Sequence, residues 1–235
     1  MTRLGLGVVI VFFAASVATG DLTWHTDQAA FEAAAAAAGL AFFELETFEE
    51  STLPPNSVLG MNDPLAPGVP NGPFPSGMTG VSDMIYQSNT LGGNPTEPSP
   101  EGPNGLAAAS VGFMGASSDI VLVSTFVHSA DMDFDDGAEK WAVGFNTLTL
   151  LGGTTVQVRA YGVGETFLGM TTVSADIGGN FFVGVIAADE GQLIGRINVY
   201  DPAAGAEGGD NIQTWIPEPA SLALLALGGL LIRRR

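Results

Sequence analysis

The stretch Thr155-Val-Gln-Val-Arg-Ala-Tyr161 decides the fold class, because its apolar and polar residues alternate strictly. In an extended chain successive side chains point to opposite sides, so Val156, Val158 and Ala160 share one face. The polar residues between them share the other face. The pattern predicts a β-strand with one face in a core and one face in solvent.

Similar short segments follow one another from Gly105 onward, separated by turn-forming residues such as Gly152-Gly153 and Gly178-Gly179. Many short strands at regular spacing predict an all-β fold, an antiparallel β-sandwich or jelly roll, rather than a parallel sheet. The further strands that we expect span residues 106–114, 119–126, 129–134, 141–150, 167–173, 180–186, 193–200 and 211–215.

One short N-terminal helix is expected over Gln28 to Ala38, a run dominated by alanine. Thr26 and Asp27 offer capping oxygens ahead of it, and Gly39 supplies the usual stop. A strand is expected directly after it, over residues 41–48.

Residues 51–103 differ in composition, since they hold 11 of the 14 prolines. Proline lacks the amide donor that helices and central strands need, so this region is predicted to be a long loop with one short strand at Met84 to Gln87. The body of the chain, residues 21–216, is long enough for one core, and we expect one domain.

Both ends have the composition of targeting segments. Arg3, an apolar run and the small residues Ala18 and Gly20 form the pattern of a secretory signal peptide over residues 1–20. At the other end, Pro217-Glu-Pro219 precedes an apolar run that ends in Arg233, Arg234 and Arg235. The apolar run is expected to enter a bilayer as a transmembrane helix, with the arginines on the cytoplasmic side.

The segment over residues 217–235 resembles the PEP-CTERM sorting signal of Gram-negative bacteria. The resemblance implies that an exosortase is a partner and that the protein is exported, with a membrane-anchored precursor, to the cell envelope, the outer surface or the extracellular space. Five segments of the body are also similar to ectodomains of PEP-CTERM proteins, which implies a sandwich of the lectin or galactose-binding-like type. They span residues 86–92, 105–113, 141–145, 182–185 and 209–212.

The body of the chain is strongly acidic. Of 25 acidic and 7 basic residues, one glutamate and four arginines lie in the end segments, which leaves 24 carboxylates against three cations and a net charge of −21. Such a surface is repelled by phosphate backbones, so nucleic acid is excluded as a partner. Since the chain has no cysteine, disulfides, thiol catalysis and thiolate metal sites are excluded as well.

Calcium is the one cofactor that the sequence suggests. Asp131, Asp133 and Asp135 alternate in a way that suits a hard cation with oxygen ligands, although the spacing departs from an EF-hand. The alternative is a strand in which Ala130 and its alternate neighbours face the core and the aspartates face water. Aligned aspartates repel one another, which favours an ion or a sheet edge.

Catalytic patterns are weak. The pairs Glu49-Glu50 and Asp189-Glu190 consist of adjacent residues, which point apart in a strand, so we expect both to belong to a solvated surface. His25 and His128 are the only histidines, and no serine-nucleophile or histidine-metal motif contains them.

Two functions remain open after these exclusions. The first is a non-catalytic cell-surface or matrix protein that contacts exopolysaccharide. The second is a secreted polysaccharide-active hydrolase or a calcium-dependent carbohydrate-binding module. In either case exposed tryptophans would favour sugar binding, because aromatic faces stack on sugar rings; the candidates are Trp24, Trp141 and Trp215.

Overall fold

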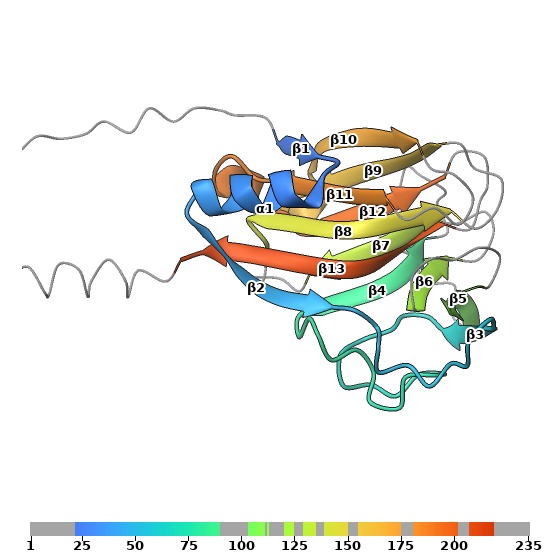
Figure 1. The fold of residues 1–235 in the computed structure, drawn as a ribbon. Helices are drawn as coiled ribbons and strands as arrows, with labels where there is room; N and C mark the ends of the chain where they lie inside the picture. Colours follow the sequence, from blue (N-terminus) through green and yellow to red (C-terminus); the bar gives the residue numbers. More distant parts are fainter. Residues whose placement is uncertain are drawn as a thin grey trace, which may run out of the picture.

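A computed structural model describes residues 22–89, 103–110, 112, 120–124, 129–134, 139–149, 155–174, 181–201 and 207–218. The predicted signal peptide (residues 1–20) lies outside these ranges, and so does the predicted sorting signal (residues 217–235) from residue 219 on. The described part is all-β, with two antiparallel sheets and one α-helix, as a β-sandwich requires (Figure 1).

The larger sheet has eight strands, seven of which lie in one continuous order. That order is β1 (Thr23–His25), β11 (Phe181–Ile186), β8 (Ala142–Thr149), β13 (Glu207–Pro217), β6 (Ile120–Ser124), β5 (Pro103–Ser110) and β3 (Val58–Asn62). The eighth, β2 (Leu40–Glu46), pairs with β13. Strand β13 therefore holds the sheet together, since it pairs with β8 on one side and with both β6 and β2 on the other.

The smaller sheet has five strands in the order β10 (Phe167–Ser174), β9 (Thr155–Tyr161), β12 (Arg196–Tyr200), β7 (Ser129–Phe134) and β4 (Met84–Asn89). Every strand pair in both sheets is antiparallel within the described ranges. The predicted strands at residues 129–134 and 155–161 have the bounds that the sequence indicated.

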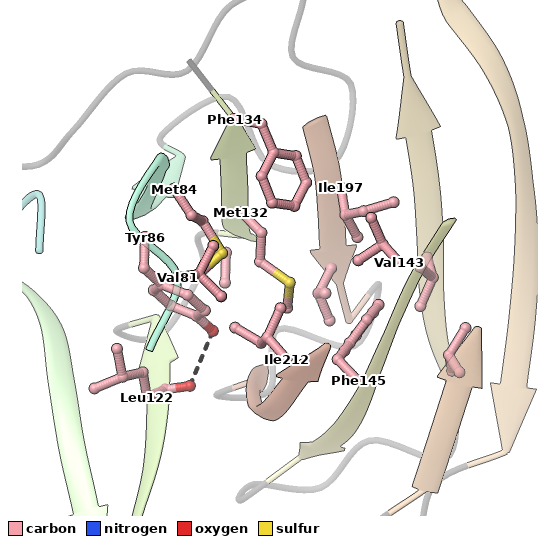
Figure 2. Close-up of a cluster of buried hydrophobic side chains, with 14 of the residues drawn as sticks. Val81, Met84, Tyr86, Leu122, Met132, Phe134, Val143, Phe145, Ile197 and Ile212 are labelled. Atoms are coloured by element: carbon pink, nitrogen blue, oxygen red, sulfur yellow. Dashed lines mark hydrogen bonds between the residues drawn. The ribbon is translucent and has the colours of Figure 1, made fainter. Parts of the chain in front are cut away.

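One core lies between the sheets, and Figure 2 shows its centre. Val156, Val158 and Ala160 belong to it, which confirms the buried face that the alternation of β9 predicted. Met132 of β7 and Ile212 of β13 meet there from opposite sheets. The core includes a satisfied polar group, because the Tyr86 hydroxyl donates to the Leu122 carbonyl over 3.0 Å.

The helix α1 (Gln28–Ala37) begins as expected, with Asp27 as its N-cap. The Asp27 carboxylate accepts a hydrogen bond from the Ala30 amide over 2.8 Å. The helix ends at Ala37, and Gly39 follows with φ +76°, the left-handed conformation that favours glycine. In Figure 1 the helix lies over the β11 and β8 part of the larger sheet, outside the core between the sheets.

The proline-rich region after β2 is held to the larger sheet by one buried carboxylate. Glu46, at the end of β2, accepts hydrogen bonds from the amides of Phe48 (2.8 Å), Thr79 (3.2 Å) and Gly80 (2.8 Å). Burial raises the pKa of Glu46, and these three amides lower it only in part. The described residues of the region contain strand β3, which the sequence did not predict, and strand β4, which it did.

Candidate functional site

A groove of about 480 Å³ crosses the outer face of the larger sheet beside α1. It lies on the side of the sheet away from the core, since its strand residues alternate with core residues such as Phe145 and Ile212. Its lining consists of Gln28 and Glu32 of α1, Phe42 and Leu45 of β2, Asn146 of β8, and Asn211, Gln213 and Trp215 of β13.

Strand β13 supplies three of these side chains through its alternation. Asn211, Gln213 and Trp215 face the groove, whereas Ile212 between them is buried in the core. The β8–β13 register shifts between Asp210 and Gln213, so a bulge lies at this point. Asn211 has φ +50°, and its amide donates to the Asp210 carboxylate over 2.6 Å. Asparagine adopts this left-handed conformation more readily than most residues, and bulges of this kind turn side chains toward a site.

A second irregularity places Phe42 and Leu45 on the same wall. Phe42 pairs with Trp215 and Leu45 with Gln213, so the register between β2 and β13 passes over Phe43. Residues three apart, which would face opposite ways in a regular strand, therefore both line the groove. Phe42 is 51% exposed, and its ring meets that of Trp215 edge-on with 5.8 Å between the centroids.

The opposite wall is α1, and the ring of Phe31 fixes its position. Phe31 is fully buried against Gly144 of β8 and Gly184 of β11, which are partners in the sheet. A Cβ atom at Gly184 would lie 2.4 Å from Phe31 Cδ2, so only glycine leaves room for the ring. The buried Phe31 ring orients the helix so that Gln28 and Glu32 face the groove. These two residues lie one helical turn apart, and Gln28 Nε2 donates to Glu32 Oε1 over 2.8 Å.

The chemistry of this lining suits a neutral ligand rich in hydroxyl groups. Four side-chain amides each offer donors and an acceptor, as hydroxyl groups do. Phe42 adds exposed aromatic surface. Trp215 is only 8% exposed and belongs to the buried cluster under α1, so it is not the exposed tryptophan that would favour sugar stacking. Its indole donates to Gln213 Oε1 over 3.3 Å. Among the described residues that line the groove, Glu32 is the only carboxylate.

A second polar cluster lies on the outer face of the smaller sheet around Asp131. Asp131 Oδ1 accepts from Arg196 Nη1 (2.9 Å) and Asn198 Nδ2 (2.8 Å), and Oδ2 accepts from Asn89 Nδ2 (2.6 Å). The Arg196 guanidinium also pairs with Glu165 and lies 4.0 Å from the centre of the Tyr161 ring. Burial raises the pKa of Asp131, and Arg196 and the amides offset this only in part.

The alternative interpretation of the aspartates is confirmed in one part, since β7 is a strand whose residues Ala130, Met132 and Phe134 belong to the core. It is wrong for Asp131, which is fully buried and ion-paired instead of solvated. Asp133 is half-buried and accepts from Gln87 Nε2 over 3.3 Å. Asp135 lies outside the described residues, so calcium binding by the three aspartates stays a prediction. Among the residues that are described, no group of three or more His, Cys, Asp or Glu side chains is placed to hold a metal ion.

The other predicted residues are spread over the fold. His25 of β1 packs edge-on against Phe31, and His128 lies outside the described ranges. Trp24 and Trp141 are half-buried at the margins of the two hydrophobic clusters. Of the predicted sorting motif, Pro217 ends β13 opposite Leu40, and the Glu218 amide donates to the Gly39 carbonyl over 3.1 Å. Pro219, Arg233, Arg234 and Arg235 are not among the described residues.

Trp215 is the only groove residue that the sequence analysis singled out. A usable signal was present in Asn211-Ile-Gln-Thr-Trp215, because period two places its two amides and its tryptophan on one face. The residues contributed by α1 and β2 carry no comparable local signal.

No family model matches the chain, and no curated protein matches it. None of the helices in the described ranges is long and apolar enough to cross a membrane.

Proposed function

We propose that this is an exported, non-catalytic surface or matrix protein that binds neutral exopolysaccharide in the groove between α1 and β13. The observation that carries the proposal is the lining itself, which combines four amide side chains with the exposed ring of Phe42 and the mostly buried ring of Trp215. Protein sites that hold small ligands combine such aromatic surface with a few placed polar groups.

The charges support binding over hydrolysis. Glycoside hydrolysis commonly uses two carboxyl groups placed on either side of the scissile bond. The lining of the groove contributes one carboxylate, Glu32, whose Oε1 already accepts a hydrogen bond from Gln28. The net charge of −21 on the body, derived from the composition, also favours a neutral polymer over an anionic one.

For location, the proposal rests on the two ends of the chain. Residues 1–20 would serve as a signal peptide, and residues 217–235 as a PEP-CTERM sorting signal that enters the membrane and is read by an exosortase. Strand β13 ends at Pro217, which supports a junction between folded domain and tail at this motif. We assign the sandwich to the lectin or galactose-binding-like type on the same resemblance.

A glycan array with the purified protein tests the groove. Neutral oligosaccharides should bind. Phe42→Ala should weaken binding at least about tenfold, which corresponds to about 1.4 kcal/mol of binding free energy, since it removes the exposed ring of the groove. Phe167→Ala is the matched control, because Phe167 is similarly exposed (55%, against 51% for Phe42) but lies on the smaller sheet. An array without hits, or equal binding by the two variants, refutes the groove as the site. Release of reducing ends from a bound glycan would favour the hydrolase instead.

Deletion of residues 219–235 tests the sorting signal. This deletion keeps the Pro217–Leu40 pair and the hydrogen bond from the Glu218 amide, so the domain should stay folded. In a host with an exosortase, the truncated protein should move from the envelope fraction to the medium or be misdirected. Identical fractionation of the two forms would show that the tail is not read.

A further inference from the structure

A row of polar residues crosses the outer face of the smaller sheet from strand to strand. Asn198 of β12 lies directly opposite Arg159 of β9 on one side and Asp131 of β7 on the other. All three alternate with core residues of their strands, so their side chains share the outer face.

Asn198 has one hydrogen-bonding atom to spare. Its Nδ2 donates to Asp131 Oδ1 and to Ser129 Oγ, both over 2.8 Å. The amide cannot be flipped, because its oxygen would then face the Asp131 carboxylate. Asn198 Oδ1 is therefore the free atom, and it is buried without a hydrogen-bond partner. Buried acceptors in this state are rare in folded proteins.

Arg159 has a matching donor to spare. Its Nη2 donates to Gln157 Oε1 over 2.7 Å, and its guanidinium lies 5.1 Å from the centre of the Tyr200 ring. Its Nη1, however, is buried and without an acceptor. Of the three cations in the described body, Lys140 pairs with Asp83 and Arg196 with Asp131 and Glu165, whereas Arg159 pairs with no carboxylate.

We propose that Arg159 and Asn198 form a second binding site, which takes two adjacent hydroxyl groups of a neutral sugar ring. One hydroxyl oxygen accepts from Arg159 Nη1, and the neighbouring hydroxyl donates to Asn198 Oδ1. Side chains directly opposite each other on one face of an antiparallel pair are close enough for adjacent hydroxyls to reach both. Arg159 is half-buried whereas Asn198 is fully buried, so the ligand must approach from the side of Arg159.

The two free atoms select this chemistry over charged ligands. A carboxylate could accept from Arg159 but has no proton for Asn198 Oδ1, and an ammonium group could donate to Asn198 but cannot accept from Arg159. The surroundings also disfavour an anion, since Asp131, Asp133 and Glu165 outnumber Arg159 and Arg196. A hydroxyl pair supplies both a donor and an acceptor without charge.

The test is a titration of the full protein with methyl glucoside, methyl galactoside and methyl mannoside, followed by the side-chain NMR signals of Asn198 and Arg159. At least one glycoside should shift these signals, and Arg159→Lys, which keeps the charge but removes Nη1, should weaken that binding at least about tenfold. Glucuronate and glucosamine should bind more weakly than the neutral glycosides. Phe42→Ala in the groove should leave the glycoside-induced shifts of the Asn198 and Arg159 signals unchanged.

The outcomes separate the two sites. No shift with any glycoside, equal affinity in Arg159→Lys, tighter binding of glucuronate or glucosamine, or loss of the shift in Phe42→Ala each overturns the second site. Glycoside binding that depends on Arg159 upholds it, even if the glycan array shows that the groove is empty.

Discussion

The contact of Phe31 with Gly184 fixes α1, and with it one wall of the groove, so it gives the sharpest test of the structure. Phe31 is fully buried, with the rings of Phe182 and Trp215 at 5.5 and 6.1 Å between centroids. Phe31→Ala should lower the free energy of unfolding by about 3–5 kcal/mol, the usual cost of removing a buried phenylalanine ring. For a domain of this size, about 2–4 °C per kcal/mol gives a drop in melting temperature of about 6–20 °C.

Gly184→Ala should be destabilising for the opposite reason. The new Cβ would lie 2.4 Å from Phe31 Cδ2 and 2.6 Å from its Cγ, well inside normal contact. Overpacking of this kind costs about 1–3 kcal/mol. Because α1 must move to relieve the overlap, glycan binding in the groove should fall together with stability.

The double variant distinguishes this contact from two unrelated effects. Once Phe31→Ala has removed the ring, the nearest remaining neighbour of the Cβ at residue 184 is Phe182 Cε1, at 3.0 Å. The cost of Gly184→Ala should therefore be much smaller in that background, and the two free energies should not add. Thermal denaturation followed by circular dichroism measures all four forms.

Two control substitutions complete the cycle. Phe167→Ala removes the same ring from an exposed position, and Gly169→Ala adds the same Cβ where its nearest neighbour, Leu22 Cδ1, is 3.5 Å away. Both should change stability much less than their counterparts. Strict additivity of Phe31→Ala and Gly184→Ala, or controls as damaging as the variants, would refute this account of how α1 is held.

Three further predictions concern charge. Burial raises the pKa of Glu46 above its ordinary 4.5, so the folded state holds the proton more tightly than the unfolded state. The free energy of unfolding should therefore fall as pH rises from 4.5 through the raised pKa. Melting temperatures across this range should fall less steeply in Glu46→Gln, and equal slopes in the two proteins would contradict the raised pKa of Glu46. Calcium binding by Asp131, Asp133 and Asp135 predicts a higher melting midpoint with calcium than with chelator, and no such shift in Asp133→Ala. At a hundredfold excess of calcium over Kd, the free energy of unfolding should rise by about 2.7 kcal/mol. Equal midpoints in the native protein would leave the ion pair with Arg196 as the role of Asp131. Binding of neutral glycans should not depend on salt, because no ion pair with the ligand is involved; a steep salt dependence on the array would count against the groove.

The fold could be predicted where its cause is local. The alternation of β9, the apolar spacing of β7 and the capped alanine run of α1 are all visible in a few consecutive residues. Strand β13 shows the limit. It begins at Glu207, within a glycine-rich stretch that resembles a turn. A Cβ at Gly208 would lie 1.9 Å from the Leu122 carbonyl oxygen, so this glycine permits close approach of β6 rather than a turn.

The candidate sites depend on contacts between distant parts of the chain, which no local pattern reveals. The pairing of Asp131 with Arg196 joins residues 65 positions apart, and it turns an expected surface aspartate into a buried one. In the groove, Phe42 and Leu45 share a wall only because the register passes over Phe43. Registers and bulges are set by the partner strand, so the sequence of one strand does not contain them.

The distribution of charge links the two proposed sites to the acidic composition. Two of the three cations of the body are used inside the domain, where Lys140 (2% exposed) and Arg196 (1% exposed) pair with carboxylates. Three cations cannot neutralise 24 carboxylates, so the body keeps a net negative charge that acts outward, against phosphate, carboxylate and sulfate polymers. The groove presents amides and aromatic rings within this acidic surface, and the Arg159–Asn198 pair offers one donor and one acceptor. In the proposed function specificity would have two sources, since the body would repel anionic polymers while the two proposed sites would bind neutral hydroxyl groups. A protein built in this way would select neutral glycans even where its individual contacts are weak.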